Sequence, residues 1–163
     1  MYLLDSNIFI QAKNLHYGFD FCPAFWNFLI QQNQHEVLYS IDKVKDEIIA
    51  GDDGLVNWVK KDELSDFFLL SDVQTAMQFN SINKWVEKKN YQQSAIQGFM
   101  EVADYYLIAQ AIQRNSIIVT HEMPSASLKK IKIPDVCLGL GIKFITPFVM
   151  LRQLHAEFVL GNI

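Results

Sequence analysis

The chain has 163 residues and a formal charge of −4, from 14 lysines and arginines against 18 aspartates and glutamates, which argues against tight, non-specific binding to nucleic acid. Half of its residues are hydrophobic and 20% are charged, which predicts an ordered globular protein, most simply one domain over residues 1–163. The two cysteines lack the spacing of metal ligands and favour a reducing cytoplasm. No uninterrupted apolar stretch approaches the roughly 18 residues that a membrane-spanning helix needs, which argues against a membrane protein.

The first half of the chain predicts three short strands separated by helices. Residues 2–4 form an apolar run that is too brief for a helix, and its interruption by Asp5 favours a strand over a secretory signal. Turn-forming residues follow at 5–7, and a loop through residues 16–18 is expected to lead to Cys22 and Pro23. The remaining predictions here are helices that begin at Pro23 and Asp42 or span 55–61, and strands at 37–40 and 67–70.

The second half continues the alternation. A helix is expected from Ser71 or Asp72 towards Lys89, and a long helix follows over 96–114. The later predictions are strands at 116–120 and 143–146, a helix at 134–140, and a helix from Pro147 through Phe158 with Gly161 past its end. Strands that alternate with helices predict an α/β fold, with a parallel sheet of about five strands covered on both faces.

Four acidic residues fall where such a fold can bring side chains together: Asp5, Glu47, Asp104 and Glu122. Asp5 and Glu122 follow apolar strands, and open parallel sheets bind ligands beyond the carboxyl ends of their strands. Glu47 projects from a helix, and Asp104 lies within the predicted long helix among apolar residues, where a charged residue is rarely without a role. Converging carboxylates repel one another unless a cation neutralises them.

This constellation predicts a site for Mg²⁺ or Mn²⁺, because both are hard cations that prefer carboxylates and water. Two such ions held about 4 Å apart can activate a water and stabilise the leaving oxygen in phosphodiester hydrolysis. Asn7 and Thr120 could orient the carboxylates or a water from behind. The sequence therefore predicts a hydrolytic site that needs no protein nucleophile.

Several of these residues also have a purely structural interpretation. Asp5 could initiate a turn, and Glu47 could lie on a solvated helix face. His121 could be a general base or a loop histidine, and Glu101 an auxiliary ligand or a surface charge. The lysines at 129–132 are interpreted as a solvated loop in preference to a phosphate clamp.

The sequence resembles the PIN-domain family of metal-dependent ribonucleases. Residues 2–8 are similar to that family's first strand and catalytic aspartate, and Glu47 occupies the place of its helix-borne glutamate. Asp104 matches the aspartate ahead of a small-residue helix. Residues 118–122 are similar to the late strand motif, in which the family more often has aspartate or asparagine at the position of Glu122.

The resemblance extends over approximately residues 2–150. It implies a three-layer sandwich with the first and fourth strands adjacent, and an endoribonuclease that uses Mg²⁺ or Mn²⁺ at Asp5, Glu47, Asp104 and Glu122. Many small bacterial members are VapC-type toxins, so an RNA substrate, an antitoxin protein and a homodimer are the partners that the resemblance implies. Two alternatives stay open: a phosphatase or DNA nuclease with the same metal centre, and a non-catalytic PIN-like interaction module.

Overall fold

A parallel sheet of five strands forms the centre of the protein. The computed structural model describes residues 1–61 and 64–159. The strands are in the order β3-β2-β1-β4-β5 and all neighbouring pairs are parallel, which confirms the predicted α/β class. Their bounds are Tyr2–Leu4 (β1), Leu38–Ile41 (β2), Phe68–Leu69 (β3), Ile117–Val119 (β4) and Phe144–Ile145 (β5).

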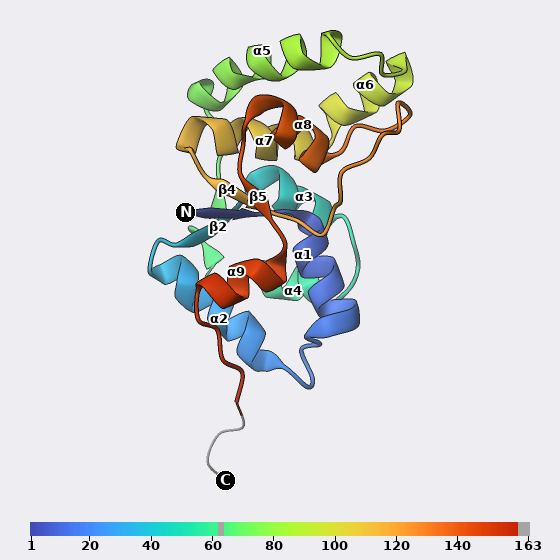
Figure 1. Ribbon diagram of the computed structural model, residues 1–163. Coiled ribbons are helices and arrows are strands. Elements are labelled where there is room, and N and C mark those ends of the chain that lie inside the picture. Colours follow the sequence, from blue (N-terminus) through green and yellow to red (C-terminus); the bar gives the residue numbers. More distant parts are fainter. Residues whose placement is uncertain (62–63, 160–163) are drawn as a thin grey trace.

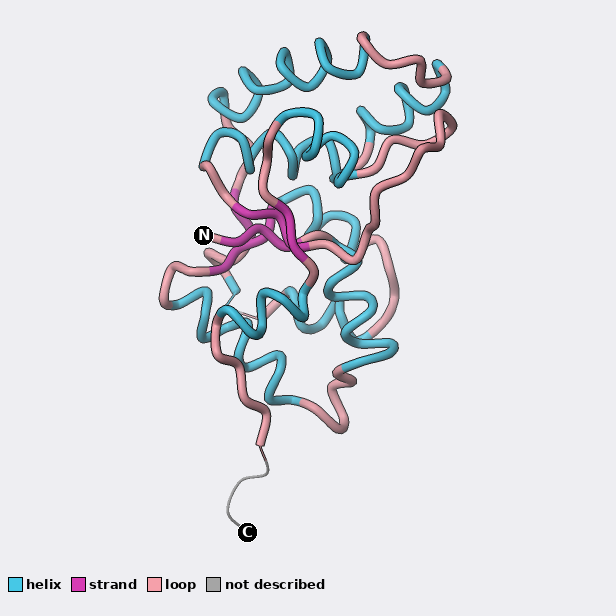
Figure 2. The backbone as a smooth tube through the Cα atoms, viewed as in Figure 1, coloured by secondary structure: helices cyan, strands magenta, loops and turns pink. Residues whose placement is uncertain are grey.

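Helices cover both faces of this sheet, so the molecule has three layers (Figures 1 and 2). One side carries α5, α6, α7 and α8, and the other carries α1, α2, α4 and α9, while α3 follows β2 and packs against both α4 and α7. The helix bounds are Ser6–Gln11 (α1), Pro23–Gln34 (α2), Asp42–Ile49 (α3), Gly54–Val59 (α4), Val73–Glu87 (α5), Gln93–Glu101 (α6), Ala103–Arg114 (α7), Ile133–Leu140 (α8) and Pro147–Gln153 (α9). None of the helices in the described ranges is both long and apolar enough to cross a membrane.

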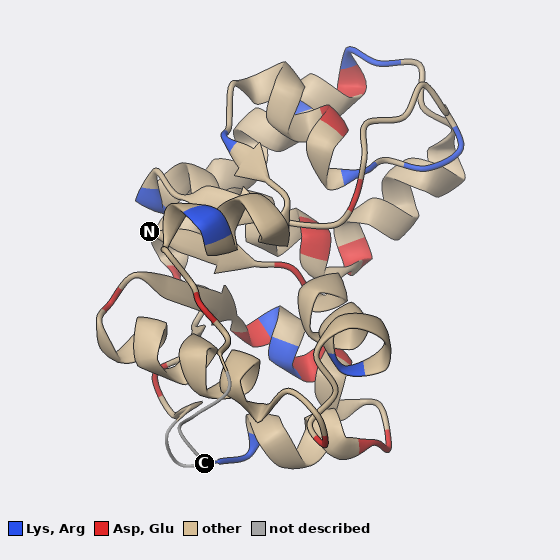
Figure 3. Ribbon diagram, turned by 60° about the horizontal axis from the view of Figure 1, so that its bottom comes forward, with Lys and Arg blue, Asp and Glu red and all other residues tan. Residues whose placement is uncertain are grey.

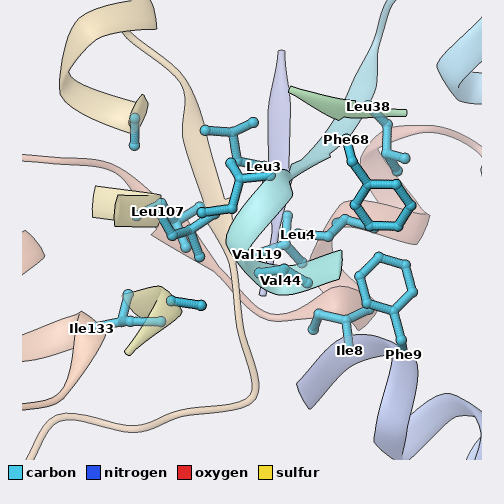
Figure 4. Packing of buried hydrophobic residues seen from close by; sticks show 14 of the residues in the cluster. Leu3, Leu4, Ile8, Phe9, Leu38, Val44, Phe68, Leu107, Val119 and Ile133 are labelled. Carbon is cyan, nitrogen blue, oxygen red and sulfur yellow. The ribbon is translucent and has the colours of Figure 1, made fainter. Parts of the chain in front are cut away.

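The core fills both sides of the sheet, as expected for short strands without a solvent-facing side. Leu3 and Leu4 are both fully buried although successive strand residues point to opposite faces. Figure 4 shows Leu3 directed towards Leu107 of α7, whereas Ile8 and Phe9 of α1 lie on the side of Phe68. Burial of apolar surface on both faces is the main force that fixes the sheet and hence the ends of its strands.

The direction in which the sheet is built reverses between β1 and β4. From β1 the chain adds β2 and β3 on one side, whereas β4 and β5 are added on the other. The first and fourth strands are therefore neighbours, with Leu4 paired to Val119, as the resemblance implied. The connections that leave two such strands diverge, and the crevice between them is where open α/β sheets bind ligands.

The segment after β1 is helical, so the predicted turn at 5–7 is wrong, whereas the predicted loop is confirmed from Tyr17 to Cys22, which belong to no helix or strand. Asp5 is the N-cap of α1, and a π-helical stretch, η1 (Ala12–His16), continues that helix. Aspartate, serine and asparagine favour helix N-termini as well as turns, so the residue types alone could not decide. Burial of Ile8 and Phe9 against the sheet stabilises the helix.

The predicted long helix over 96–114 is also wrong, because the chain breaks at Val102. This residue ends α6 and precedes α7 with an extended backbone, at φ −101° and ψ 164°. Asp104 therefore lies in the first turn of α7 instead of the middle of a longer helix. The break turns the N-terminus of α7 towards the carboxyl edge of the sheet.

The last helix is shorter than predicted. α9 ends at Gln153, and His155 takes a left-handed conformation with φ 52°, which stops a helix. The apolar residues beyond Gln153 suggested a longer helix, but Phe158 packs against α2 from outside α9. The centroid of its ring lies 6.1 Å from that of Phe25. Gly161, expected past the helix end, lies outside the described residues.

Candidate active site

A cavity of about 450 Å³ opens at the carboxyl edge of the sheet, at the point where the strand order reverses. We call it the acidic pocket. All four acids singled out by the sequence line it: Asp5, Glu47, Asp104 and Glu122. The opposite wall comes from α6 and from the segment before α8, and includes Ser94, Gly98, Phe99, Lys129, Lys130 and Ile131. Four elements separated in sequence thus deliver one carboxylate each to a single cavity.

A hydrogen-bond network fixes the orientation of Asp5. The carboxylate is only 3% exposed, and its Oδ2 accepts from the hydroxyl of Thr120 at 2.7 Å. The same hydroxyl oxygen accepts from Asn7 Nδ2 at 3.1 Å and from the backbone N–H of Glu122 at 3.0 Å. Thr120 therefore holds Asp5 directly and Asn7 acts through Thr120, which is the arrangement expected of groups that orient a carboxylate from behind.

Glu47 and Glu122 each accept a hydrogen bond from the start of a helix. Glu47 Oε1 accepts from the backbone N–H of Ala103 at 3.1 Å, and Glu122 Oε2 accepts from that of Ile133 at 3.0 Å. These are first residues of α7 and α8, where N–H groups lack intrahelical partners and favour negative charge. Both glutamates thus have a capping role that the sequence did not reveal.

Burial and mutual repulsion raise the pKa of two of the acids. The pKa of Asp104 rises to about 8, through burial first and then through the charges of Asp5, Glu122 and Glu47, with Lys130 opposing the shift. Burial likewise raises the pKa of Asp5 to about 6, although the hydrogen bond from Thr120 acts in the opposite direction. In the absence of a cation, the pocket therefore retains protons that exposed aspartates would have released.

The histidine near the pocket points elsewhere. The ring of His121 stacks on His16 with centroids 5.7 Å apart and lies 5.9 Å from the ring of Phe148, and neither histidine lines the acidic pocket. Burial first, and then His16, lowers the pKa of His121. Glu101, the other open candidate, is exposed and lies outside the pocket lining. Neither residue is positioned with the four acids.

The lysine-containing loop does reach the pocket. Lys129 and Lys130 line it, and Lys130 Nζ lies 3.7 Å from Glu122 Oε1. The interpretation of this loop as a merely solvated segment is therefore incomplete. The pocket combines four carboxylates with two ammonium groups at its rim.

The donor set suits a hard divalent cation, although the side chains stand too far apart to share one ion. Within residues 1–61 and 64–159, no three carboxylate, histidine or cysteine side chains are grouped closely enough to hold a metal ion together. The pocket nevertheless supplies only oxygen donors, and a cation would relieve the repulsion that raises the pKa of Asp104. To join such an ion, Glu47 and Glu122 would turn from the helix N–H groups that they now contact.

The α6 wall was not foreseen from the sequence. Ser94, Gly98 and Phe99 line the pocket because the break at Val102 directs α6 across it. A continuous helix over 96–114 would have carried these residues elsewhere. No local signal marks the break, since neither proline nor glycine occurs next to Val102.

These features define a three-layer α/β fold of the PIN-like type, with an acidic pocket at the switch point of its sheet. The chain belongs to the family described as "Domain of unknown function (DUF4411)", whose profile matches residues 2–158. A comparison with curated protein sequences finds no match. Among solved structures the chain is similar to FitAcB from Neisseria gonorrhoeae, with a TM-score of 0.56 and 15% identity over 91% of this chain and 99% of that one. At this identity the likeness shows the fold alone.

Proposed function

We propose that the protein is a metal-dependent endoribonuclease that hydrolyses RNA phosphodiester bonds at the acidic pocket. The observation that carries this proposal is the convergence of Asp5, Glu47, Asp104 and Glu122 from four elements on one cavity. Burial first, and then repulsion between these groups, disfavours the ionised form of Asp104 and destabilises the fold at neutral pH, as the raised pKa of Asp104 indicates. A bound cation would reverse that effect, and a structural role alone does not require the four charges to meet.

The chain's own residues have distinct tasks in this proposal. The four acids would hold Mg²⁺ or Mn²⁺, which when bound lowers the pKa of a water and neutralises charge on the scissile phosphate. Thr120 and Asn7 keep Asp5 in one orientation. Lys129 and Lys130 place positive charge at the rim, where a polyanionic strand would enter.

The direct test is cleavage of labelled RNA by the full chain with Mg²⁺, Mn²⁺ or a chelator. We expect cleavage with either metal and none with the chelator. The variant Asp5→Asn keeps the shape of the side chain and its place beside Thr120, so it should fold and be inactive. Wild-type activity in this variant, or cleavage that persists in chelator, would contradict the assignment.

A related enzyme could use the same centre on another phosphate ester. Competition among RNA, single-stranded DNA and small phosphate monoesters would separate a ribonuclease from a DNA nuclease or a phosphatase. RNA should be the substrate that is cleaved fastest and that competes best. Preferential turnover of a monoester would favour the phosphatase.

One observation favours a non-catalytic alternative. Glu47 and Glu122 already have partners at the starts of α7 and α8, so both would have a use in a scaffold that binds no metal. Titration calorimetry with Mn²⁺ distinguishes the two: heat of binding that disappears in Asp104→Asn supports the enzyme. Absence of Mn²⁺ binding, together with stable capture of a partner protein, supports the interaction module.

The proposal extends to a biological role as the toxin of a toxin–antitoxin pair, in line with the PIN-domain resemblance. In that case a small protein encoded next to this chain should bind it and block RNA cleavage. Co-expression of the two proteins, followed by co-purification and a cleavage assay, tests this role. A homodimer, the other partner implied, is tested by the mass of the purified chain in solution.

A further inference from the structure

A second cavity, of about 420 Å³, lies beside the acidic pocket. We call it the Trp85 pocket, and its lining includes Trp85, Lys88, Lys89, Tyr91, Leu128 and Asp135. One segment joins the two cavities, because residues 125–128 line the Trp85 pocket and 129–131 line the acidic pocket. The backbone N–H of Gln92 donates to the carbonyl of Leu128 at 2.9 Å and ties this segment to the start of α6. Figure 1 shows the segment, in orange, running along the connection between α5 and α6.

Two aromatic rings form one wall of the Trp85 pocket. The centroids of Trp85 and Tyr91 are 6.0 Å apart and their planes are inclined at 45°, so the rings do not cover each other. The indole is seated against α8, where a Cβ on Gly139 would overlap it. The ammonium of Lys89 lies 5.4 Å from the Trp85 centroid, which shows that this face of the ring is reached by a polar group. A rigid aromatic face of this kind can stack with a nucleic-acid base.

Positive charge gathers around the same cavity in a chain that is acidic as a whole. Lys88 and Lys89 are exposed, and neither forms an ion pair with any residue that the structure describes. Lys129 and Lys130 continue the charge to the acidic pocket along the shared segment. Blue stretches occur in the upper right part of Figure 3, with red ones among them. Glu87 directly precedes the two lysines in the sequence.

Asp135 adds one negative charge to the lining of the Trp85 pocket. Its Oδ1 accepts from the backbone N–H of Ser125 at 2.8 Å, whereas Oδ2 is shielded from solvent and has no hydrogen-bond partner among the described residues. The shielded Oδ2 is not open to an incoming group, so Asp135 acts on a ligand through its negative charge. That charge disfavours a phosphate next to Asp135, whereas Lys88 and Lys89 favour one.

We propose that the Trp85 pocket binds one nucleotide of a single-stranded RNA, with the base against Trp85 and Tyr91 and the phosphate at Lys88 and Lys89. This inference rests on the proposed function in one respect, that RNA is the substrate whose strand continues into the acidic pocket. It goes beyond that function because it assigns a second binding site and selects single strands, whose bases are free to stack. A base-paired duplex offers only its phosphates to the same surface.

The test measures binding of a fluorescent 12-nucleotide oligouridylate to the full chain in chelator, so that cleavage plays no part. Trp85→Leu should weaken binding about five- to a hundredfold and leave the salt dependence unchanged. The double variant Lys88→Ser with Lys89→Ser should reduce the slope of log affinity against log salt by about 0.7, because the two lysines hold one phosphate. Both lysines are exposed, so the double variant keeps the fold even if Trp85→Leu does not.

The matched control is Lys60→Ser with Lys61→Ser, which removes the same charge from an exposed pair outside both cavities. It should leave both affinity and salt slope as in the wild type. Equal effects of the two double variants, or duplex RNA binding as tightly as the single strand, would overturn the proposal. Competition by polyglutamate as effective as that by oligouridylate would also overturn it and point to an acidic protein segment.

The two proposals can fail separately. Binding that depends on the Trp85 pocket, without cleavage in Mg²⁺ or Mn²⁺, would reject the nuclease and support the nucleotide site. Cleavage that is unchanged in kcat/KM by both pocket variants, together with unchanged affinity, would support the nuclease and reject the nucleotide site.

Discussion

The two edges of the sheet carry hollows of similar size and opposite character. The acidic pocket at the carboxyl edge measures about 450 Å³, and a hollow at the amino edge measures about 330 Å³. Four carboxylates line the first, whereas no carboxylate from the described residues lines the second. The amino-edge hollow is bounded by Met1, Asn115, Ser116, Gly141, Lys143 and apolar neighbours.

The direction of the chain explains this difference. Helices that connect parallel strands begin at the carboxyl edge and end at the amino edge, so free N–H groups of α7 and α8 face the acidic pocket. At the other edge the same helices end in left-handed residues, Asn115 at φ 50° and Gly141 at φ 71°. The topology therefore favours anionic side chains at the carboxyl edge only. The volume of a cavity in this sheet does not indicate the charge of the residues that line it.

The largest difference between the edges should appear in catalysis. Asp104→Asn should reduce metal-dependent RNA cleavage by at least about a hundredfold, because it removes one of the proposed metal ligands. Mutation of a group that only supports a metal ligand already costs about tenfold or more in metal affinity or activity. Asn115→Gly, at the amino edge, should cleave at the wild-type rate. A gel assay of labelled RNA in Mn²⁺ measures both variants. Equal rates in the two would remove the distinction between the edges.

A smaller loss is expected from the network behind the pocket. Thr120→Val deletes the hydroxyl that donates to Asp5 and should lower cleavage about ten- to a hundredfold. Because that hydrogen bond lowers the pKa of Asp5, its loss should also move the acidic limb of the pH–rate profile upwards. Thr120→Ser retains the hydroxyl and should restore both rate and profile. A loss of rate without a shift of the profile would reduce Thr120 to a packing role.

The acidic pocket should also make the metal-free protein sensitive to pH. The folded pKa values of Asp104, about 8, and Asp5, about 6, exceed the ordinary value of 3.8, so folding takes up protons between these limits. Their stabilising contribution is complete below pH 3.8 and is lost as the pH rises through the folded values. Thermal unfolding in chelator should therefore give a lower Tm at pH 8.5 than at pH 5.

Asp104→Asn provides the control for this prediction. At pH 8.5 in chelator its Tm should exceed that of the wild type by about 3 °C or more, equivalent to roughly 1 kcal/mol. Mn²⁺ should raise the Tm of the wild type and leave that of the variant nearly unchanged. If the wild type shows the same Tm at both pH values, the four charges do not interact as the structure indicates.

The smallest effect belongs to the amino edge. Asn115→Ala forces an alanine into a left-handed conformation and should reduce the free energy of unfolding by about 1 kcal/mol. Asn115→Gly should not, because glycine adopts that conformation freely. Neither change should alter cleavage or its pH dependence. Urea denaturation measures the difference, and a pH-dependent effect of Asn115→Ala would mean that the edges are coupled.

The site residues that follow strands were predictable from the sequence, because short local patterns mark where those strands end. An apolar run followed by an acid is visible at Asp5 and again near Glu122, and the alternation of strands and helices predicted the parallel sheet. The adjacency of β1 and β4, in contrast, came from the family resemblance. It depends on contacts between residues more than a hundred positions apart, such as Leu4 and Val119.

The helical parts of the site were less predictable. The break at Val102 has no composition signal, because it is stabilised by a carboxylate 56 positions away, that of Glu47 on Ala103. The capping role of Glu122 likewise depends on where α8 begins in space. Asp5 through Asn7 did carry a helix-start signal, but the same residue types form turns, and only the burial of Ile8 and Phe9 decides between them.

The interruption at Val102 gives Glu47 two competing partners. The side chain of Val102 has no hydrogen-bond acceptor that could cap α7, so the N–H of Ala103 donates to the carboxylate of Glu47 on α3 instead. A cation that took Glu47 Oε1 as its ligand would displace the Ala103 N–H, and a cap of this kind is worth about 1 kcal/mol, or roughly a fivefold reduction in apparent affinity. If the pocket binds a metal as we propose, occupancy of the site and the anchoring of α7 to α3 would be thermodynamically linked through this one side chain. A bound metal would then loosen the attachment of α7 to α3, and a tighter attachment would weaken metal binding by the same factor.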